Sequence, residues 1–288
     1  MDVEKLITNE FRRNIGLLTE KEQKTLLHSR AAVAGAGGVG GLHILTLARS
    51  GVSAFNIADP DNFEAVNVSR QFGAFHSTIG KNKAETLAEM VKDINPAADV
   101  RVFKESINSA NVDDFLKDAD IFIDGIDFFE IEARRLLFKK ARDKKIFAIT
   151  AAPLGFGATL QTFSPQGMSF DEYFGIKDST PEIEKLAAFA AGLAPHPYHI
   201  KYMDLSKVSL TAKTGPALAL ACTLCASIAA AETIKILTGK GEVKAVPHYT
   251  QIDLLRNKFR RGYIYGGGKN PFQLIKKWII LKKAGSSA

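Results

Sequence analysis

Four glycines, Gly35, Gly37, Gly38 and Gly40, have the spacing of a turn that holds a phosphate group. They lie in "AAVAGAGGVGGLHILTLARSG", between an apolar run and a helical pattern, and Asp59 follows roughly twenty residues later. Glycines let the backbone approach a ligand closely, and the N–H groups at a helix N-terminus favour an anion. The loop alone is compatible with a dinucleotide used for hydride transfer or with ATP.

Polar residues farther along the chain favour ATP. The stretch "NVSRQ" supplies Asn67, Arg70 and Gln71, "IGKNKAE" supplies Lys83, and Asp127 follows the apolar run "IFID". When a carboxylate attacks the α-phosphate of ATP, negative charge builds on the phosphoryl oxygens and on the leaving pyrophosphate. Cations must meet that charge, and an acid must hold Mg²⁺. A NAD-dependent enzyme does not need this further set of residues.

Alternating strands and helices are expected to position these residues. Buried strands are expected at 30–37, 54–61, 99–107, 120–127 and 146–152, with helical patterns between them. This alternation predicts an α/β fold, a doubly wound, mostly parallel, Rossmann-like sheet with helices on both faces. The stretch "ATLQTFSP" predicts an antiparallel continuation. Ligands of such sheets lie beyond the carboxyl ends of the strands, which is where the candidate residues occur.

The motifs together resemble the ubiquitin-activating-enzyme-like family of ThiF, MoeB and HesA type. The matching blocks are "GAGGVG", "ADPD", "NVSRQ", a lysine after "IG", and an aspartate where the family has T-D-N. The resemblance runs from about residue 8 to about residue 165 and resumes at "AAAETIKILTG" (229–239). It implies an ATP- and Mg²⁺-dependent adenylyltransferase that activates a carboxylate as an acyl-adenylate.

The resemblance also assigns roles to single residues. Gly38 lies where the backbone meets the phosphates, Asp59 matches the residue that binds the ribose hydroxyls, and Asp61 is the second acid of a D-x-D-like pair with Asp59. Asn67 and Arg70 match nucleotide and phosphate contacts, with Gln71 beside them. Lys83 matches the lysine on the phosphates, and Asp127 matches the magnesium ligand. The segment "FRRNIGLL" places Arg13 at the family's arginine that reaches into the neighbouring subunit. The resemblance therefore implies a homodimer in which Arg13 is supplied in trans.

Several of these positions have competitors in the sequence. Lys81 competes with Lys83, Arg12 with Arg13, and Asp124 with Asp127, although Asp124 also suits the end of a strand. Arg70 is otherwise a surface ion-pairing residue, Asp61 a turn residue, and His196 and His199 ordinary loop residues without a third metal ligand. Two other functions stay open: an NAD(P)-dependent oxidoreductase, and a non-catalytic nucleotide-binding module that presents a carrier protein to a partner enzyme.

Departures from the family pattern bear on the reaction. The T-D-N block is "IDF" here, zinc-binding C-x-x-C pairs are missing, and residues 164–212 contain no cysteine where thioester-forming relatives place their nucleophile. Cys222 and Cys225 lie in an apolar helical stretch, which predicts two buried core thiols. We therefore expect adenylation without a thioester step. The resemblance implies that the substrate is the C-terminal carboxylate of a small ubiquitin-like or sulfur-carrier protein, a peptide, or a modified tRNA base.

The chain is expected to divide into an adenylation domain, 1–255, and a basic tail, 256–288. Within the domain, 1–30 form a helical arm and 164–212 a crossover segment that covers the substrate. The net charge is +7, and nine Lys or Arg with no acid occur from Arg256 onward. Without them 29 bases face 31 acids, so the body is near neutral. A basic tail suggests an anionic membrane surface or RNA as a partner, or simply a solvated arm.

The end of the tail, "NPFQLIKKWIILKKAG", predicts an amphipathic helix. Phe272, Ile275, Trp278 and Ile279 share one side, and lysines lie elsewhere. This pattern fits either an interfacial membrane helix or, as the favoured interpretation, a helix packed on its own domain or dimer partner. No apolar run is expected to span a membrane, and the N-terminus lacks the apolar core of a signal peptide. The sequence thus predicts a cytoplasmic protein, either free or peripheral to the membrane.

Overall fold

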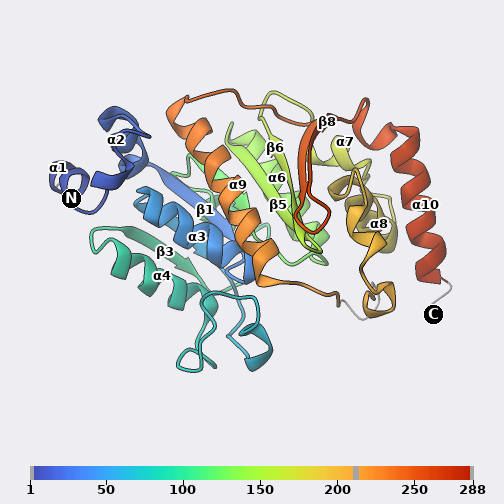
Figure 1. Ribbon diagram of the computed structural model, residues 1–288, viewed down its shortest axis with the longest axis horizontal. Helices are drawn as coiled ribbons and strands as arrows, with labels where there is room; N and C mark the ends of the chain where they lie inside the picture. The colour runs from blue at the N-terminus through green and yellow to red at the C-terminus, as the bar shows by residue number, and fades with distance from the viewer. Residues whose placement is uncertain (1–2, 210–213, 286–288) are drawn as a thin grey trace.

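An eight-stranded sheet forms the centre of the molecule. The computed structural model describes residues 3–209 and 214–285. The strands are β1 (Arg30–Ala34), β2 (Ala54–Ala58), β3 (Asp99–Phe103), β4 (Ile121–Asp124), β5 (Phe147–Leu154), β6 (Gly157–Phe163), β7 (His248–Asp253) and β8 (Lys258–Tyr263). Their order in the sheet is β3-β2-β1-β4-β5-β6-β7-β8 (Figure 1). The first five are parallel and the last three antiparallel, which confirms the predicted fold.

Two apolar cores, one on each face, hold the helices to the sheet. Alternate residues of a strand point to opposite faces, so Ala31 and Val33 of β1 belong to one core and Ala32 and Ala34 to the other. The first core is covered by α3 (Gly38–Ser50), α4 (Lys83–Ile94) and α9 (Ala219–Thr238); the second by α5 (Val112–Phe115), α6 (Ile131–Asp143), α7 (Phe170–Phe174) and α8 (Glu182–Leu193). Figure 1 shows the first group in front of the sheet.

The N-terminal arm packs beside the C-terminal end of α3. It consists of α1 (Val3–Thr8), a 3-10 turn η1 (Arg12–Asn14) and α2 (Glu20–His28). A capping box of Thr19 and Glu22 opens α2 with both reciprocal hydrogen bonds. Gly51 ends α3 at φ +105°, a left-handed conformation that glycine adopts without strain. The arm is fixed to this end of α3 because Gln23 Nε2 donates to the Ser50 carbonyl at 3.2 Å.

Helix α9 lies in the core, as its composition predicts, but one expectation about it is wrong. Among the described residues it is the one helix long and apolar enough to cross a membrane on length and composition, whereas no such run was expected. Its contacts with α3, β5 and β6 place it against the sheet. Cys222 and Cys225 are both free and buried, which confirms the interpretation as core thiols.

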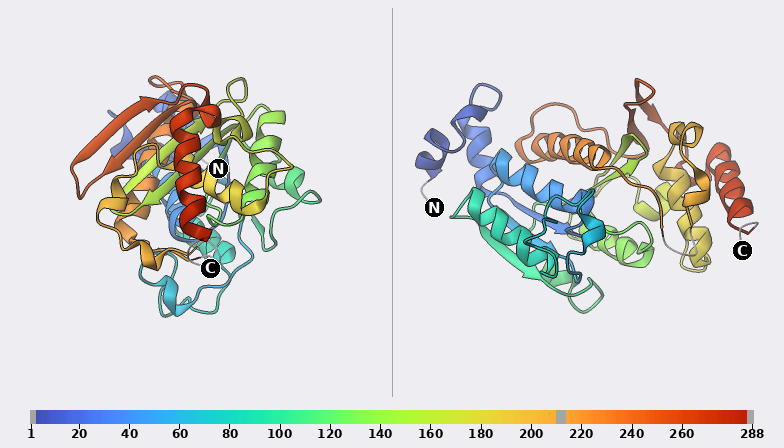
Figure 2. Two further views of the ribbon diagram at one scale, coloured as in Figure 1. Left: turned by 90° about the vertical axis from the view of Figure 1, so that its right-hand side faces the viewer. Right: turned by 60° about the horizontal axis from the view of Figure 1, so that its bottom comes forward.

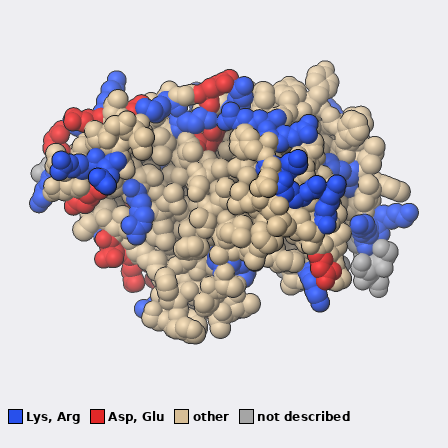
Figure 3. Space-filling model, viewed as in Figure 1, with Lys and Arg blue, Asp and Glu red and all other residues tan. Residues whose placement is uncertain are grey.

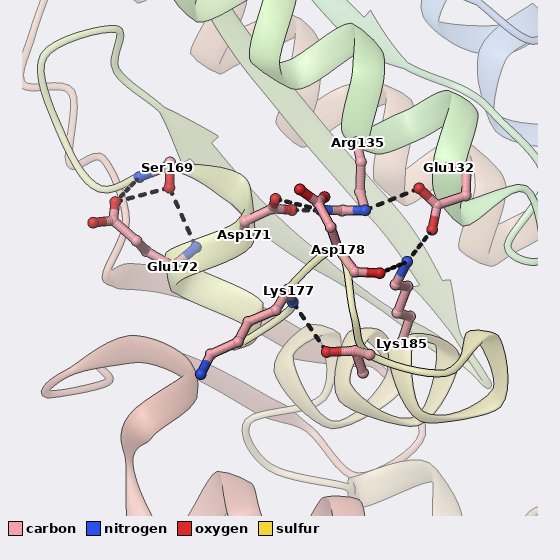
Figure 4. Close-up of polar contacts among 9 residues, drawn as sticks. Glu132, Arg135, Ser169, Asp171, Glu172, Lys177, Asp178 and Lys185 are labelled. Carbon is pink, nitrogen blue, oxygen red and sulfur yellow. Dashed lines mark hydrogen bonds and ion pairs between the residues drawn. The ribbon is translucent and has the colours of Figure 1, made fainter.

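The crossover segment is folded and ion-paired to α6. It contains α7, α8, η3 (Tyr198–Lys201) and η4 (Leu205–Lys207), while 210–213 lie outside the described residues. Figure 4 shows Arg135 of α6 directed at Asp171 and Asp178, and Lys185 of α8 reaching Glu132. The nitrogen–oxygen distances are between 2.6 and 2.9 Å. These ion pairs fix α7 and α8 against α6.

The sheet extends past residue 255. Residues 248–263 form a hairpin, with β8 paired antiparallel to β7 from Asp253↔Lys258 to His248↔Tyr263. The boundary expected at residue 255 therefore falls inside a hairpin, and the basic segment starts with a strand of the sheet. After η5 (Gly267–Lys269), α10 (Pro271–Gly285) packs against α8. Figure 2 shows α10 outermost at this end of the molecule.

Candidate functional site

The glycine loop lies where the strand order of the sheet reverses. It leaves β1, whose neighbours β2 and β4 continue the sheet in opposite directions, and this is where ligands of doubly wound sheets bind. A Cβ on Gly35 would lie 2.1 Å from the Gly125 carbonyl oxygen, and one on Gly40 1.8 Å from that of Gly35. Glycine is therefore required at both positions, because the loop packs directly on the chain that follows β4.

The N-terminus of α3 is open toward this edge of the sheet. Its N-cap, Gly37, has no side chain to accept hydrogen bonds from the first turn. The first N–H groups of a helix need such acceptors, and a phosphate can supply them. The N-terminus of α3 therefore has no side-chain cap at Gly37, and anion binding at Gly38 stays a prediction.

Asp59 ties the loop to the end of β2. Its Oδ2 accepts from Ala36 N at 2.7 Å and its Oδ1 from Asp61 N at 2.9 Å. Burial raises the pKa of Asp59, and the two backbone hydrogen bonds oppose that shift. A carboxylate oxygen can accept more than one hydrogen bond, so Asp59 keeps acceptor capacity for ligand hydroxyls.

Lys83 at the start of α4 forms an ion pair with Asp61, which follows β2. Its Nζ lies 2.9 Å from Asp61 Oδ2, and the residue is only 7% exposed at the start of α4. Asn82 caps α4 and donates to the carbonyls of Asp59 and Asp61 at 3.2 and 3.1 Å. Lys81, the competing lysine, is exposed. A cleft of about 470 Å³ opens beside this segment and is lined by Pro60, Asn62, Gly80, Lys81, Asn82, Glu85, Thr86, Glu89 and Lys104.

The "NVSRQ" segment contacts the glycine loop through its last two residues. A Cβ on Gly38 would lie 3.5 Å from the Arg70 carbonyl oxygen and 3.8 Å from Arg70 Cγ. A Cβ on Gly37 would lie 3.5 Å from Gln71 Nε2. Within the described residues, the buried Gln71 Oε1 has no hydrogen-bond partner. A buried polar atom without a protein partner beside this loop can accept a hydrogen bond from a ligand or from water.

Asn67 has a structural task within its own loop. It ends the 3-10 turn η2 (Ala65–Asn67), and its Oδ1 accepts from Glu64 N at 2.9 Å. Its side chain therefore shapes the segment that carries Arg70, and its predicted contact with a nucleotide stays a prediction.

Asp127 lies in a loop organised by a buried arginine. Arg134 Nε pairs with Asp124 Oδ2 at 2.8 Å, with the two side chains 3% and 1% exposed. Arg134 also donates to the carbonyls of Ile126 at 2.6 Å and Asp127 at 3.1 Å. Asp124 is thus the strand-end residue, while the carboxylate of the exposed Asp127 accepts from Phe129 N at 3.0 Å.

This carboxylate suits a magnesium ion shared with phosphates. No cluster of three or more His, Cys, Asp or Glu residues that could hold a metal occurs in 3–209 or 214–285. Mg²⁺ is commonly held by one or two carboxylates together with substrate phosphates and water, so a single exposed aspartate is compatible with it.

Arg13 lies far from the glycine loop of its own chain. It belongs to η1 in the N-terminal arm, where the neighbouring Asn14 side chain donates to the carbonyl of Ser50, the last residue of α3. The loop precedes the other end of this 13-residue helix, about 20 Å away at 1.5 Å per residue. Arg13 is exposed, and its predicted role in a partner's site stays a prediction.

Comparison with known proteins agrees with the motifs and the fold. Residues 11–265 match the model of the ThiF family. The chain belongs to this family. It is 34% identical over 137 residues to a tRNA threonylcarbamoyladenosine dehydratase from Haemophilus influenzae, covering 47% of this chain and 52% of that protein. It is 28% identical over 226 residues to the adenylyltransferase/sulfurtransferase MoeZ from Mycobacterium tuberculosis, covering 76% of this chain and 50% of that protein.

A solved structure shares the fold. Escherichia coli MccB, solved with AMPCPP and MccA, superposes with a TM-score of 0.67 at 20% identity, covering 92% of this chain and 73% of that chain. This ThiF-family chain spans about half the length of the curated relatives that it matches.

Three contributors to the site escaped the sequence analysis. Gly125, which follows β4, packs against the glycine loop, and Arg134 holds the Asp127 segment by hydrogen bonds to its carbonyls. The Sγ atom of Cys222 would lie 3.2 Å from a Cβ on Gly38. Gly125 had a signal, since it directly follows the "IFID" strand. The contact of Cys222 joins residues 184 apart in the chain and follows only from the packing of α9 on α3.

Proposed function

We propose that this ThiF-family protein is an ATP- and Mg²⁺-dependent adenylyltransferase that activates a carboxylate as an acyl-adenylate. One observation carries the proposal: Asp59, Arg70, Gln71 and the loop after β4 all meet the turn that precedes the open N-terminus of α3. A helix N-terminus with a buried acid on one side and an arginine on the adjoining segment suits a nucleoside triphosphate; the Arg70 guanidinium donates to the Val66 carbonyl at 3.3 Å in the free protein. The solved MccB complexes include one with ATP.

In this mechanism the chain's own residues bind and orient the nucleotide. The N–H groups at Gly38 hold phosphate oxygens, and Asp59 accepts from the ribose hydroxyls. Arg70 and Lys83 meet the charge that grows on the α-phosphate and on pyrophosphate as the carboxylate attacks. Lys83 is held by Asp61 in the free protein and is shared with the phosphates in the complex. Asp127 would hold Mg²⁺, which neutralises phosphate charge.

The active form would be a homodimer. Arg13 is exposed on the N-terminal arm, about a helix length from its own glycine loop, so it can complete only a partner's site. An arginine supplied in trans makes each site dependent on the dimer.

The reaction would stop at the adenylate, with no thioester on the enzyme. Burial raises the pKa of both Cys222 and Cys225, which disfavours the thiolate that a thioester requires. The crossover segment contains no cysteine in its sequence. A separate nucleophile would therefore attack the acyl-adenylate.

The substrate would be the C-terminal carboxylate of a small carrier protein or a peptide. Relatives include a SAMP-activating enzyme from Haloferax volcanii, and MccB is solved with MccA. The crossover segment from Ser164, held on α6 by its ion pairs, would cover this substrate and select it. A modified tRNA base is the second class, since a relative is named for threonylcarbamoyladenosine.

ATP–pyrophosphate exchange tests the reaction without a known substrate. Wild-type protein is incubated with Mg–ATP, labelled pyrophosphate and the proteins and peptides below about 20 kDa from a native lysate. We expect exchange that depends on this fraction, and a partner that gains the mass of AMP at its C-terminus. Lys83→Met should abolish exchange, while the matched control Lys81→Met retains it. Equal exchange by both variants, or none by the wild type with any fraction, would overturn the proposal.

A further inference from the structure

Helix α10 carries an apolar face that points to solvent. Phe272, Ile275 and Trp278 are 76%, 54% and 61% exposed, and Leu274 and Ile279 are exposed beside them. Side chains three and four positions apart lie on one side of a helix, so Phe272, Ile275 and Ile279 form a continuous stripe with Trp278 at its edge. Contiguous exposed apolar surface on this scale marks an interaction site.

Polar contacts fix the orientation of α10, whose inner side also carries the half-buried Ile280 and Leu281. Gln273 is buried, and Lys276 Nζ donates to the carbonyls of Ala191, Ala194 and Pro195 at the end of α8, at 2.8, 2.9 and 3.3 Å. Lys277 pairs with Glu184 of α8 at 2.8 Å. Cations stabilise the carbonyl end of a helix. Turning the stripe inward would break these contacts, so the stripe stays outside.

The surface around the stripe is basic. No acid follows Asp253 in the sequence, and the exposed residues of this end include Lys258, Arg260, Arg261, Lys269 and Lys282. Figure 3 shows Lys and Arg gathered over the β8 hairpin and toward α10. The Lys282 ammonium lies 5.3 Å from the Trp278 ring. Tryptophan and lysine together with an apolar stripe are the composition of helices that lie in the interface of an anionic bilayer.

We propose that α10 docks the protein on anionic phospholipid membranes, with Phe272, Ile275, Trp278 and Ile279 in the interface and the surrounding Lys and Arg on the headgroups. A second copy fits less well, because joining two such faces brings the lysines of both chains together. RNA would bind the Lys and Arg side chains, but it would give no reason for the exposed apolar stripe.

Trp278 is the single tryptophan of the chain, so its fluorescence reports on α10 directly. The full-length protein is titrated with vesicles of phosphatidylcholine containing 30% phosphatidylglycerol, and with pure phosphatidylcholine as the control. We expect a blue shift with the anionic vesicles only, quenching when brominated phosphatidylcholine replaces part of the neutral lipid, and reversal at high salt. An emission maximum that is insensitive to anionic vesicles would overturn the proposal.

Matched variants distinguish specific membrane binding by α10 from nonspecific binding of exposed apolar residues. By co-sedimentation, Phe272→Ser/Ile275→Ser should lower the vesicle partition coefficient at least tenfold, and each of Lys269→Gln and Lys282→Gln about fivefold. Leu17→Ser, at an equally exposed site on the N-terminal arm, should bind as the wild type. Light scattering without vesicles should give the same mass for all variants. A mass that falls only in Phe272→Ser/Ile275→Ser would identify a second copy as the occupant and overturn the proposal.

Discussion

Replacing Arg134 by methionine should destabilise the protein and loosen the loop that carries Asp127. The side chain is buried, pairs with the buried Asp124, and donates to two carbonyls of the Ile126–Asp127 turn. Arg134→Met keeps much of the side-chain volume and removes every one of these donors. It leaves the carboxylate of Asp124 buried without its cation.

The size of the effect follows from that unpaired charge. Removing one partner of a buried ion pair costs about 3–5 kcal/mol, which should appear as a lower free energy of unfolding in urea. The double variant Arg134→Met/Asp124→Asn removes the stranded charge and keeps an acceptor for Ile126 N, which lies 3.1 Å from Asp124 Oδ1. Most of the lost stability should return in the double variant.

Measuring Mg–ATP binding distinguishes the effect of Arg134 on the position of the Asp127 loop from its effect on the stability of the fold. The double variant still lacks the donors to the Ile126 and Asp127 carbonyls, so isothermal titration calorimetry should show an affinity for Mg–ATP about tenfold weaker in both variants, equivalent to about 1.4 kcal/mol. The neighbouring Arg135 is the matched control. Within the part of the chain that the structure describes, its hydrogen bonds go to Asp171, Asp178 and Glu132 and none goes to the Asp127 loop, so Arg135→Met should bind Mg–ATP as the wild type.

Two results would refute this reasoning. If the double variant recovers wild-type affinity together with stability, Arg134 acts only as the counter-ion of Asp124. If Arg134→Met loses less than about 1 kcal/mol, the pair is not held in the buried geometry described above.

Three further predictions concern the loop, the core and the dimer. Gly40→Ala should abolish Mg–ATP binding measured by calorimetry, because its Cβ would overlap the Gly35 carbonyl oxygen, at 1.8 Å. Burial lowers the pKa of His43 to about 3, so as pH falls below the ordinary histidine pKa the unfolded chain binds a proton before the folded protein does. Relative to His43→Leu, the wild type should therefore lose about 2 kcal/mol of its free energy of unfolding in urea between pH 7 and pH 5. Mixing inactive Arg13→Ala and Lys83→Met proteins should restore part of the ATP–pyrophosphate exchange, since one site of the mixed dimer is intact; no recovery after verified subunit exchange would exclude action in trans.

The sequence predicts the parallel half of the fold because its signals are local. Apolar runs such as Ile121–Asp124 bury both faces and read as strands without reference to the rest of the chain. The glycines of the loop and the capping residues of α2 act within a few positions of themselves. Their geometry in the structure follows the spacing in the sequence.

Other features depend on contacts between distant segments. β8 carries Lys258, Arg260 and Arg261 and is exposed along most of its length, since it is the last strand of the sheet, so it has no apolar pattern to read. Cys222 reaches Gly38 through the packing of α9 on α3. For α10, the sequence identifies the apolar side, while the direction in which it faces depends on how Lys276 binds α8.

Lys276 also links α10, the proposed membrane-binding helix, to the crossover segment, which is proposed to cover the substrate. Lys276 lies on α10, and its three acceptors are carbonyls at the end of α8 and just after it, within the crossover segment. α8 is in turn bonded to α6 through Lys185 and Glu132, and α6 carries the arginine that shapes the Asp127 loop. Side-chain contacts therefore join α10 to α8 and α8 to α6, where the Glu132 side chain is 59% exposed, and α6 also carries Arg134 at the Asp127 loop. Docking α10 on a surface would fix the orientation of the substrate-covering segment relative to that surface, because the helices between them are held by ion pairs rather than by a flexible linker.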